Sequence, residues 1–333
     1  MLDRGRRQGQ ETAARKRRRC YTESTPLNTK ALAILVALGV VWGASFLFIK
    51  VIVEETAPLT LVAGRLTFGA IPLLLVVAIR RPKIVAPRTI LPKALVTAVF
   101  ATSLPFFLIA SGEQHIASGV AAVLNSTMPL WTAVFTAFFL PHERLGRSAL
   151  WGLALGFGGV LVLSSPDLRH LTDSSFLGQL AVLTAALSYG SALVFARKTL
   201  AREDPVLVAT LQVALGALIV WPLAFAVAGG SPNLDVGLKA WLAWLTLGVL
   251  GTGFAYIAYY WLMVNIGVLV SAVTYFPPVI GLLLGWLVLG ESLGVNVLAG
   301  AALIILGVAV LSGRLEVALR ALVGGGRNQA TAD

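Results

Sequence analysis

Long apolar runs alternate with short segments rich in glycine, proline and charged residues along most of this chain. A run of about 20 apolar residues is long enough to cross a bilayer as a helix. Turn-forming residues such as Pro58, Pro141 and Gly229 separate the runs. The pattern predicts an all-α integral membrane protein with ten transmembrane helices, at residues 31–53, 57–79, 90–112, 116–140, 147–164, 176–198, 205–228, 238–264, 268–290 and 294–312.

The composition of the 333 residues agrees with this prediction, because 57% are hydrophobic and only 12% are charged. Soluble domains carry about 25% charged residues, and the mean hydropathy here is +0.85. These values exclude a soluble enzyme, a nucleic-acid-binding protein and a secreted disulfide scaffold. The single cysteine, Cys20, allows no intrachain disulfide.

The distribution of the net charge of +11 predicts the orientation of the chain. Basic residues are enriched in the cytoplasmic flanks of membrane helices, and nine of the 26 basic residues lie within the first 30 positions. With that segment in the cytoplasm, Arg80 and Arg81 are cytoplasmic and Glu54 and Glu55 lie on the opposite side. We therefore expect a bacterial-type cytoplasmic (inner) membrane protein with both termini in the cytoplasm, including a disordered basic tail at residues 1–30 and a second tail at 313–333.

The two halves of the chain resemble each other. An offset of 147 aligns Trp42-Gly43 with Tyr189-Gly190, and an offset of 148 aligns Pro129, Glu143, Gly152 and Gly159 with Pro277, Glu291, Gly300 and Gly307. Each half, residues 31–165 and 166–312, holds five predicted helices, and an odd number places the halves in opposite orientations. This inverted repeat predicts a transporter that alternates between two orientations of a central cavity.

The residues that repeat also resemble a known family. The run Val41–Lys50, followed by Pro58 and Arg65, resembles the opening of an EamA-type repeat, and the aligned proline, glutamate and glycines resemble its close in both halves. The resemblance covers residues 31–312 and indicates the drug/metabolite transporter superfamily. It implies ten helices in two inverted repeats and the export of amino acids, other metabolites or toxic compounds.

Prolines interrupt two predicted helices at equivalent positions. The fourth contains Asn125-Ser126-Thr127-Met128-Pro129 and the ninth contains Tyr275-Phe276-Pro277-Pro278. Broken helices at matching positions of inverted repeats indicate a binding site near the midplane, so Pro129, Pro277 and Pro278 are predicted helix breaks with a role in gating. The alternative is a packing kink, in which the polar side chains bond back to the preceding turn.

Aromatic residues supply further candidates for the cavity wall. Tyr256, Tyr259 and Tyr260 share one helix face, although an aromatic belt at the membrane interface explains them equally well. Trp42 and Tyr189 occupy matching repeat positions, with close helix packing around the neighbouring glycines as the alternative. The predicted wall consists of Trp42, Ser45, Asn125, Ser126, Met128, Tyr189, Tyr256, Tyr260, Tyr275 and Phe276.

Two cations near the outer ends of the first helices, Lys50 and Arg65, are possible charge contacts for a solute that carries a carboxylate. They could instead pair with Glu113 or its neighbours, or extend to the interface. For Gln212 we expect an interhelical contact, and for Glu143 and Glu291 a capping role. No carboxylate lies near the centre of a predicted helix, which favours facilitated transport, while His115 keeps proton coupling open.

Neither a metal site nor a catalytic constellation is predicted. The histidines are scattered among loops, and no metalloprotease or nucleophile-elbow motif occurs. We therefore predict no cofactor and no enzyme activity. The favoured function is export of amino acids and related small metabolites, with multidrug export as the alternative and a membrane-embedded enzyme or scaffold as weaker ones. The expected partners are a small-molecule substrate and the lipid bilayer, with neither nucleic acid nor an obligate protein partner.

Overall fold

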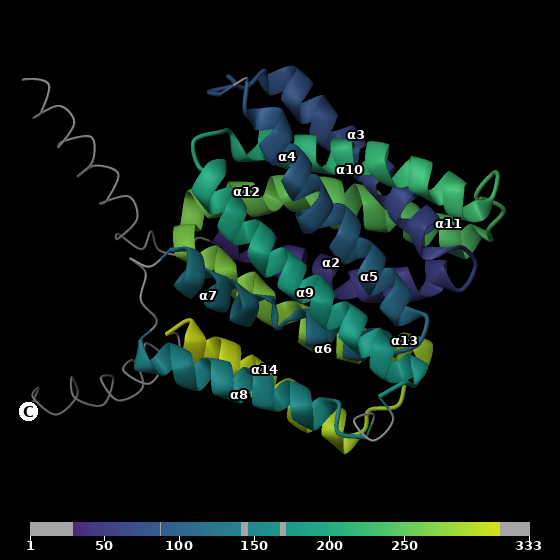
Figure 1. Ribbon diagram of the computed structural model, residues 1–333, viewed down its shortest axis with the longest axis vertical. Coiled ribbons are helices and arrows are strands. Elements are labelled where there is room, and N and C mark those ends of the chain that lie inside the picture. Colours follow the sequence, from purple (N-terminus) through teal and green to yellow (C-terminus); the bar gives the residue numbers. More distant parts are fainter. Residues whose placement is uncertain (1–28, 87, 141–145, 167–170, 314–333) are drawn as a thin grey trace, which may run out of the picture.

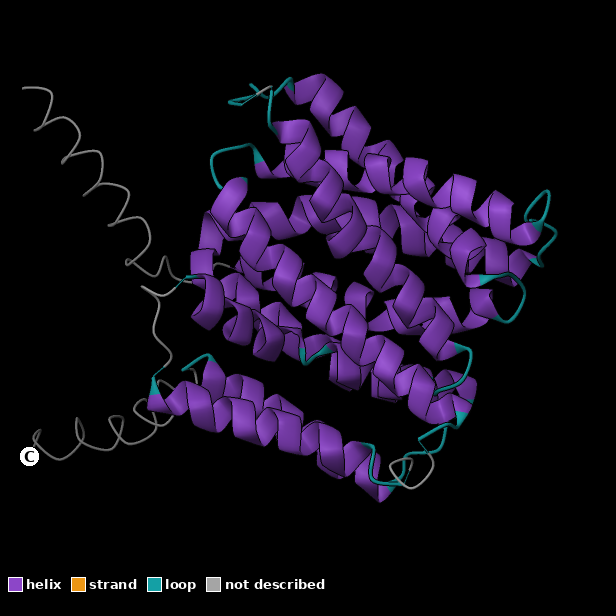
Figure 2. Ribbon diagram, in the orientation of Figure 1, coloured by secondary structure: helices purple, strands orange, loops and turns teal. Residues whose placement is uncertain are grey.

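The computed structural model describes residues 29–86, 88–140, 146–166 and 171–313. Every regular element in these ranges is helical (Figure 2), so the prediction of an all-α protein is confirmed for them. The predicted tail at residues 1–30 lies almost wholly outside the described residues, as do Glu143 and the segment after residue 313.

The helices of the first half follow the predicted ranges closely. They are α2 (Thr29–Val53), α3 (Pro58–Arg80), α4 (Ile90–Ala98), η1 (Val99–Ser103), α5 (Leu104–Glu113), α6 (Ser118–Asn125), α7 (Met128–Phe139) and α8 (Arg147–Leu163). The π-helical turn η1 joins α4 to α5 within one continuous run. Such turns inside α-helices are frequent at functional sites.

The second half repeats this arrangement. It consists of α9 (Ser174–Thr199), α10 (Pro205–Ala228), α11 (Leu238–Leu245), η3 (Thr246–Phe254), α12 (Ala255–Ile266), η4 (Gly267–Tyr275), α13 (Phe276–Leu289) and α14 (Val295–Leu311). The π-helical η3 begins at Thr246, which is 147 residues after Val99, the first residue of η1. The same local distortion therefore recurs at the repeat offset.

Eight helical runs in the described residues are long and apolar enough to cross a membrane. They extend from 21 to 29 residues, and the chain is accordingly a multi-pass membrane protein. Two further apolar helices, α8 and α14, have 17 residues each. That length is at the lower limit for a span.

The two shorter helices lie side by side (Figure 1) and pack against each other through glycine residues. A methyl group added at Gly152 of α8 would lie 2.7 Å from the carbonyl oxygen of Gly307 in α14, and one added at Gly159 would lie 2.8 Å from that of Gly300. Small residues allow the backbones to approach this closely, and such packing replaces the hydrophobic effect, which does not drive association inside lipid.

Glycines also fix two other contacts, between α2 and α13 and between α7 and α9. Gly43 packs on Ile280: a methyl group added at Gly43 would lie 2.5 Å from the Cβ of Ile280. Gly190 packs on Thr132, with a corresponding distance of 2.8 Å to its backbone nitrogen. Close helix packing around both predicted glycines is thus present.

The two ends of the bundle differ in their connections. We call the end where α2 begins and α14 ends the terminal end; both lie on the left in Figure 1. The opposite end, with the loops at residues 54–57, 114–117 and 290–294, is called the distal end. Ile52 and Ile116 are buried there and belong to a continuous apolar core.

Candidate functional site

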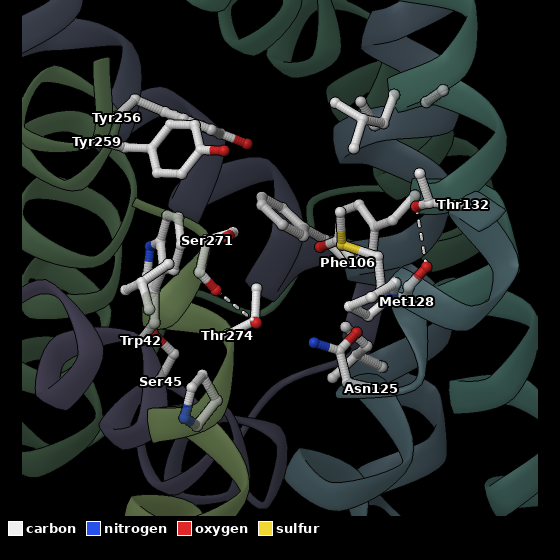
Figure 3. Close-up of a pocket in the computed structure, with 18 of the residues that line it drawn as sticks. Trp42, Ser45, Phe106, Asn125, Met128, Thr132, Tyr256, Tyr259, Ser271 and Thr274 are labelled. Carbon is white, nitrogen blue, oxygen red and sulfur yellow. Dashed lines mark hydrogen bonds between the residues drawn. The ribbon is translucent and has the colours of Figure 1, made fainter. Parts of the chain in front are cut away.

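A cavity of about 450 Å³ lies between helices from both halves of the chain. Ile49, Arg65 and Ile109 line it on the side toward the distal end, whereas Ala196, Val208 and Ser312 line it near the terminal end. Figure 3 shows Asn125, Met128 and Thr132 on one wall and Trp42, Tyr259 and Ser271 on the opposite wall. A volume of this size accommodates a small organic molecule.

The first break in the helices contributes to this wall. Helix α6 ends at Asn125, and α7 begins at Met128 with Pro129 in its first turn, where a proline needs no hydrogen-bond partner. The Ser126 and Thr127 hydroxyls donate back to the carbonyls of residues 123 and 124, at 2.6 and 2.7 Å. The polar side chains of this segment divide: Asn125 lies on the cavity wall, whereas Ser126 and Thr127 bond back to the preceding turn.

The second break has a different geometry. The segment η4 is a 3-10 helix that begins at Gly267, whose φ of 54° favours glycine. The Tyr275 hydroxyl lies 2.9 Å from the Ser312 hydroxyl, beside the cavity. Phe276 packs against Gly39 of α2 and not into the cavity, because α13 starts there and turns the ring toward α2.

Aromatic rings form most of one side of the cavity. The ring centroids are 5.5 Å apart for Trp42 and Tyr259, 5.6 Å for Tyr259 and Tyr260, and 6.4 Å for Tyr256 and Tyr260. Tyr189 meets Phe106 edge to face at 6.3 Å. All these rings present apolar faces and the tyrosines add hydroxyl groups at their tips, a surface suited to an amphipathic solute.

Arg65 supplies the positive charge of the cavity wall. The side chain is only 6% exposed; its Nε donates to the Thr252 hydroxyl at 3.1 Å and its Cζ lies 3.6 Å from the centre of the Phe106 ring. Within the described residues, no carboxylate lies within 4.0 Å of the guanidinium and its terminal nitrogens donate no hydrogen bond. A guanidinium matches a carboxylate through two parallel hydrogen bonds.

Lys50 lies outside the cavity wall and stabilises the distal end. Its Nζ donates to the backbone carbonyl of Glu113 at 2.6 Å and to that of Ile116 at 3.2 Å. The carboxylate of Glu291 accepts from the backbone nitrogens of Ser118 and Gly119, at 2.7 and 3.1 Å, so its predicted capping role is confirmed. We call these four hydrogen bonds the distal clamp, because they hold the segment at 113–119 to α2 and to the loop before α14.

The structure brings most of the sequence-predicted residues together and leaves some apart. Those on the cavity wall are Trp42, Ser45, Arg65, Asn125, Met128, Pro129, Tyr189, Tyr256, Tyr260, Tyr275 and Pro277. Those away from it are Lys50, Ser126, Phe276 and Pro278, because Lys50 and Ser126 bond to backbone and the other two pack within the bundle.

Several wall residues were not predicted from the sequence. They include Phe106, Thr132, Gln212, Ser271 and Thr274. The repeat offset of 147 does relate Gln212 to Arg65, and this relationship was the available signal. Acidic residues are absent from the described cavity wall, and no group of three potential metal ligands occurs among the described residues.

Comparison with known proteins identifies the family. The profile of the EamA-like transporter family matches residues 29–165 and 176–313. The uncharacterized transporter YoaV of Bacillus subtilis is 28% identical over 280 residues, which cover 84% of this chain and 95% of that protein.

Two further relatives carry more informative names. A protein of Salmonella typhimurium named as a probable amino-acid metabolite efflux pump is 30% identical over 286 residues, covering 83% of this chain and 92% of its own length. The uncharacterized inner membrane transporter YedA of Escherichia coli (strain K12) is 27% identical over 260 residues, which cover 78% of this chain and 83% of that protein.

A solved crystal structure has the same fold. It superposes with a TM-score of 0.60 at 23% identity and covers 85% of this chain and 97% of that one. The family match extends over both halves of the chain and includes the helices that form the cavity. This protein belongs to the EamA-like transporter family, within the drug/metabolite transporter superfamily.

Proposed function

We propose that this transporter exports amino acids and related small metabolites that carry a carboxylate, by alternating access in a bacterial-type inner membrane. The observation that carries the proposal is Arg65, a buried cation on the cavity wall with no carboxylate partner among the described residues. A charge at this depth is costly unless it is paired. A carboxylate on the substrate supplies the missing partner.

The rest of the wall is consistent with this class of solute. Tyr256, Tyr259 and Tyr260 offer ring faces to an apolar side chain. Figure 3 shows the Asn125 amide nitrogen directed into the cavity, where it can donate to the same carboxylate. The relative named as an amino-acid metabolite efflux pump supports the same substrate class.

The charge on the wall also weighs against the alternative of multidrug export. Many toxic organic compounds are cations, and Arg65 repels them. Because the described wall has no acidic residue, nothing there offsets the repulsion. Neutral and anionic drugs remain compatible with the cavity.

Alternating access is supported by contacts that obey a two-fold relationship. Gly152 packs on Gly307, which is the equivalent of Gly159, while Gly159 packs on Gly300, the equivalent of Gly152. Reciprocal contacts of this kind are expected for two units related by a two-fold axis. They favour two inverted repeats of five helices each, with α8 and α14 as the fifth and tenth crossings.

The cavity has the asymmetry expected of one state of a carrier. Its wall extends toward the terminal end, and the distal clamp stabilises the opposite end. With both termini in the cytoplasm, as the charge distribution predicts, this is the inward-facing state. Transport then requires that the clamp break and an equivalent closure form at the terminal end.

We infer that the transport is facilitated by the protein rather than driven by protons. A proton-coupled carrier needs a group that exchanges a proton in the same cavity as the substrate. The described wall contains neither a carboxylate nor a histidine. Substrate moving down its own gradient is then sufficient.

Uptake by purified protein in sealed liposomes tests this function. We expect saturable uptake of one or more radiolabelled amino acids without any imposed gradient, and no uptake by empty liposomes. In the Arg65→Gln variant, the KM for the transported amino acid should rise by about tenfold or more, since a charged hydrogen bond contributes about 1.5–3 kcal/mol. Arg65→Lys should retain part of the affinity.

Arg80→Gln is the matched control, because the Arg80 side chain is 56% exposed, near Asp204. It should transport like the unchanged protein. Folded protein that transports no amino acid, or an Arg65→Gln variant with an unchanged KM, would reject the carboxylate assignment. Preferential uptake of cationic drugs would instead support the multidrug alternative.

A further inference from the structure

Glu113 is a buried carboxyl group without any hydrogen-bond partner. It is the last residue of α5 and its side chain has no exposed surface. Neither Oε1 nor Oε2 has a partner, and no described cation lies within 4.0 Å of them. Burying an ionised carboxylate in this way is expensive, whereas a protonated carboxyl is neutral.

The charged neighbours of Glu113 leave it unpaired. Lys50 from α2, Arg65 from α3 and Glu291 from the loop before α14 are close enough to act on it electrostatically. The Lys50 ammonium bonds instead to backbone carbonyls, one of them that of Glu113 itself, and Glu291 bonds to the start of α6. Where α9 packs on the end of α5, Gly178 and Val182 lie against Gly112. His115 also lies against Gly178.

The location of Glu113 links it to closure of the distal end. Ile109, one helical turn earlier on the same face of α5, lines the cavity, as does Ile49, the neighbour of Lys50. Glu113 itself is not on the wall. It therefore lies one turn beyond the cavity, under the distal clamp, which separates it from solvent at that end.

We propose that the Glu113 carboxyl is a proton-binding site that controls opening of the distal end. In the closed state described here the carboxyl holds a proton. When the clamp breaks, water reaches the group and it releases the proton at neutral pH, as an exposed glutamate does. The closed state thus binds one proton more than the open state, so acid favours closure and alkaline pH favours opening.

This inference rests on the proposed alternating access but adds a distinct property. The proton enters and leaves on the distal side only, because Glu113 is not on the wall of the cavity that extends toward the terminal end. Protonation therefore changes the rate of transport without driving it. The inference is compatible with a facilitated carrier and identifies a regulatory ligand for it.

A cysteine reporter at the distal end measures the opening directly. Ser118 is fully buried and its hydroxyl has no partner, so Ser118→Cys loses no hydrogen bond; Cys20→Ser removes the native thiol. The protein in lipid nanodiscs is treated with a membrane-impermeant maleimide between about pH 5 and about pH 8. We expect labelling to accelerate with pH by up to tenfold per unit, the limit for one proton.

Three variants give the labelling its controls. Ser165→Cys, at an exposed position near the distal end, corrects for the pH dependence of thiol reactivity itself. After this correction Glu113→Gln should label at a rate independent of pH, because glutamine imitates the protonated carboxyl. Glu113→Asp should keep a pH dependence.

Infrared spectroscopy of the unlabelled protein supplies a second measurement. A band from a protonated carboxyl should be present near pH 7 and absent from Glu113→Gln, or shifted in Glu113→Asp if the glutamine variant fails to fold. Equal pH dependence in the glutamine variant, absence of labelling at every pH, or absence of the infrared band would each overturn the proposal. Amino-acid uptake is measured separately, so loss of the proposed function remains distinguishable from loss of this site.

Discussion

Gly152 of α8 and Gly307 of α14 approach so closely that a methyl group on Gly152 would lie 2.7 Å from the Gly307 carbonyl oxygen. The obstacle is backbone, which cannot rotate away as a side chain can. Helix crossings of this kind depend on small residues. The contact makes a direct prediction about stability.

We expect Gly152→Ala to destabilise the protein by about 1–3 kcal/mol, the usual cost of overpacking. Gly158 lies on the same helix with nothing within 4 Å of an added methyl group, so it is the matched control. Gly158→Ala should be neutral or stabilising by up to about 1 kcal/mol, since alanine favours helix over glycine. Thermal unfolding in detergent measures both, and equal melting temperatures would contradict the packing argument.

Removal of the ammonium of Lys50 should loosen the distal clamp. Lys50→Met keeps the apolar stem but leaves the carbonyls of Glu113 and Ile116 without their donor. Each charged hydrogen bond contributes about 1.5–3 kcal/mol, so amide hydrogen exchange of residues 114–119 should accelerate by about tenfold or more. Lys93→Met, at a half-buried lysine that donates to the Thr89 hydroxyl one turn earlier, should leave that exchange unchanged.

Polar and aromatic positions of the cavity wall should affect transport rather than folding. Asn125→Ala and Tyr260→Ala should each reduce the initial rate of amino-acid uptake by several-fold, with little change in the melting temperature, because both side chains line open space. Asn265→Ala is the control for the first, as Asn265 is exposed and bonds within its own helix. Normal uptake by both wall variants would remove these residues from the substrate site.

Glu203 should be important for stability at the terminal end. It is 7% exposed and its carboxylate accepts from the backbone nitrogens of Val85 and Ala86, at 2.9 and 2.8 Å. Glu203→Ala removes the charged acceptor of two part-buried hydrogen bonds and should cost about 1.5–3 kcal/mol in all, the contribution of a hydrogen bond to a charged group. Glu54→Ala, at an exposed glutamate, should change the melting temperature little, and a similar loss in both variants would show that the contact is unimportant.

The helical pattern could be predicted from the sequence because each long helix is determined by its own residues. An apolar run of sufficient length must form a helix in lipid, where an unpaired backbone group is too costly, and prolines such as Pro58 and Pro205 start new helices. The break before Pro129 was equally readable, because proline lacks a backbone donor. The π-helical turns η1 and η3 were not, since glycine-rich and apolar sequences form π and α turns alike.

The candidate site could be predicted only in part, because the direction of a side chain depends on more than its own helix. Trp42 and Tyr189 were found because they recur at the repeat offset, and both line the cavity. Phe276 was a candidate because it stands in the second predicted helix break, yet as the first residue of α13 it packs on Gly39 of α2. The rotation of a side chain about a helix axis depends on which neighbour packs first, and this is a tertiary property.

The sequence by itself determined the membrane class, the helical segments, the internal repeat and the family, since these depend on hydropathy, turn residues and spacing. Tertiary structure alone decided the roles of the charged groups. Arg65 and Lys50 looked alike in sequence, but Arg65 lines the cavity while Lys50 bonds to two backbone carbonyls. Glu113, which stands at the end of a helix, became a buried group without a partner. Only packing decides whether a charge meets water, a partner or neither, because desolvation depends on neighbours that are remote in sequence.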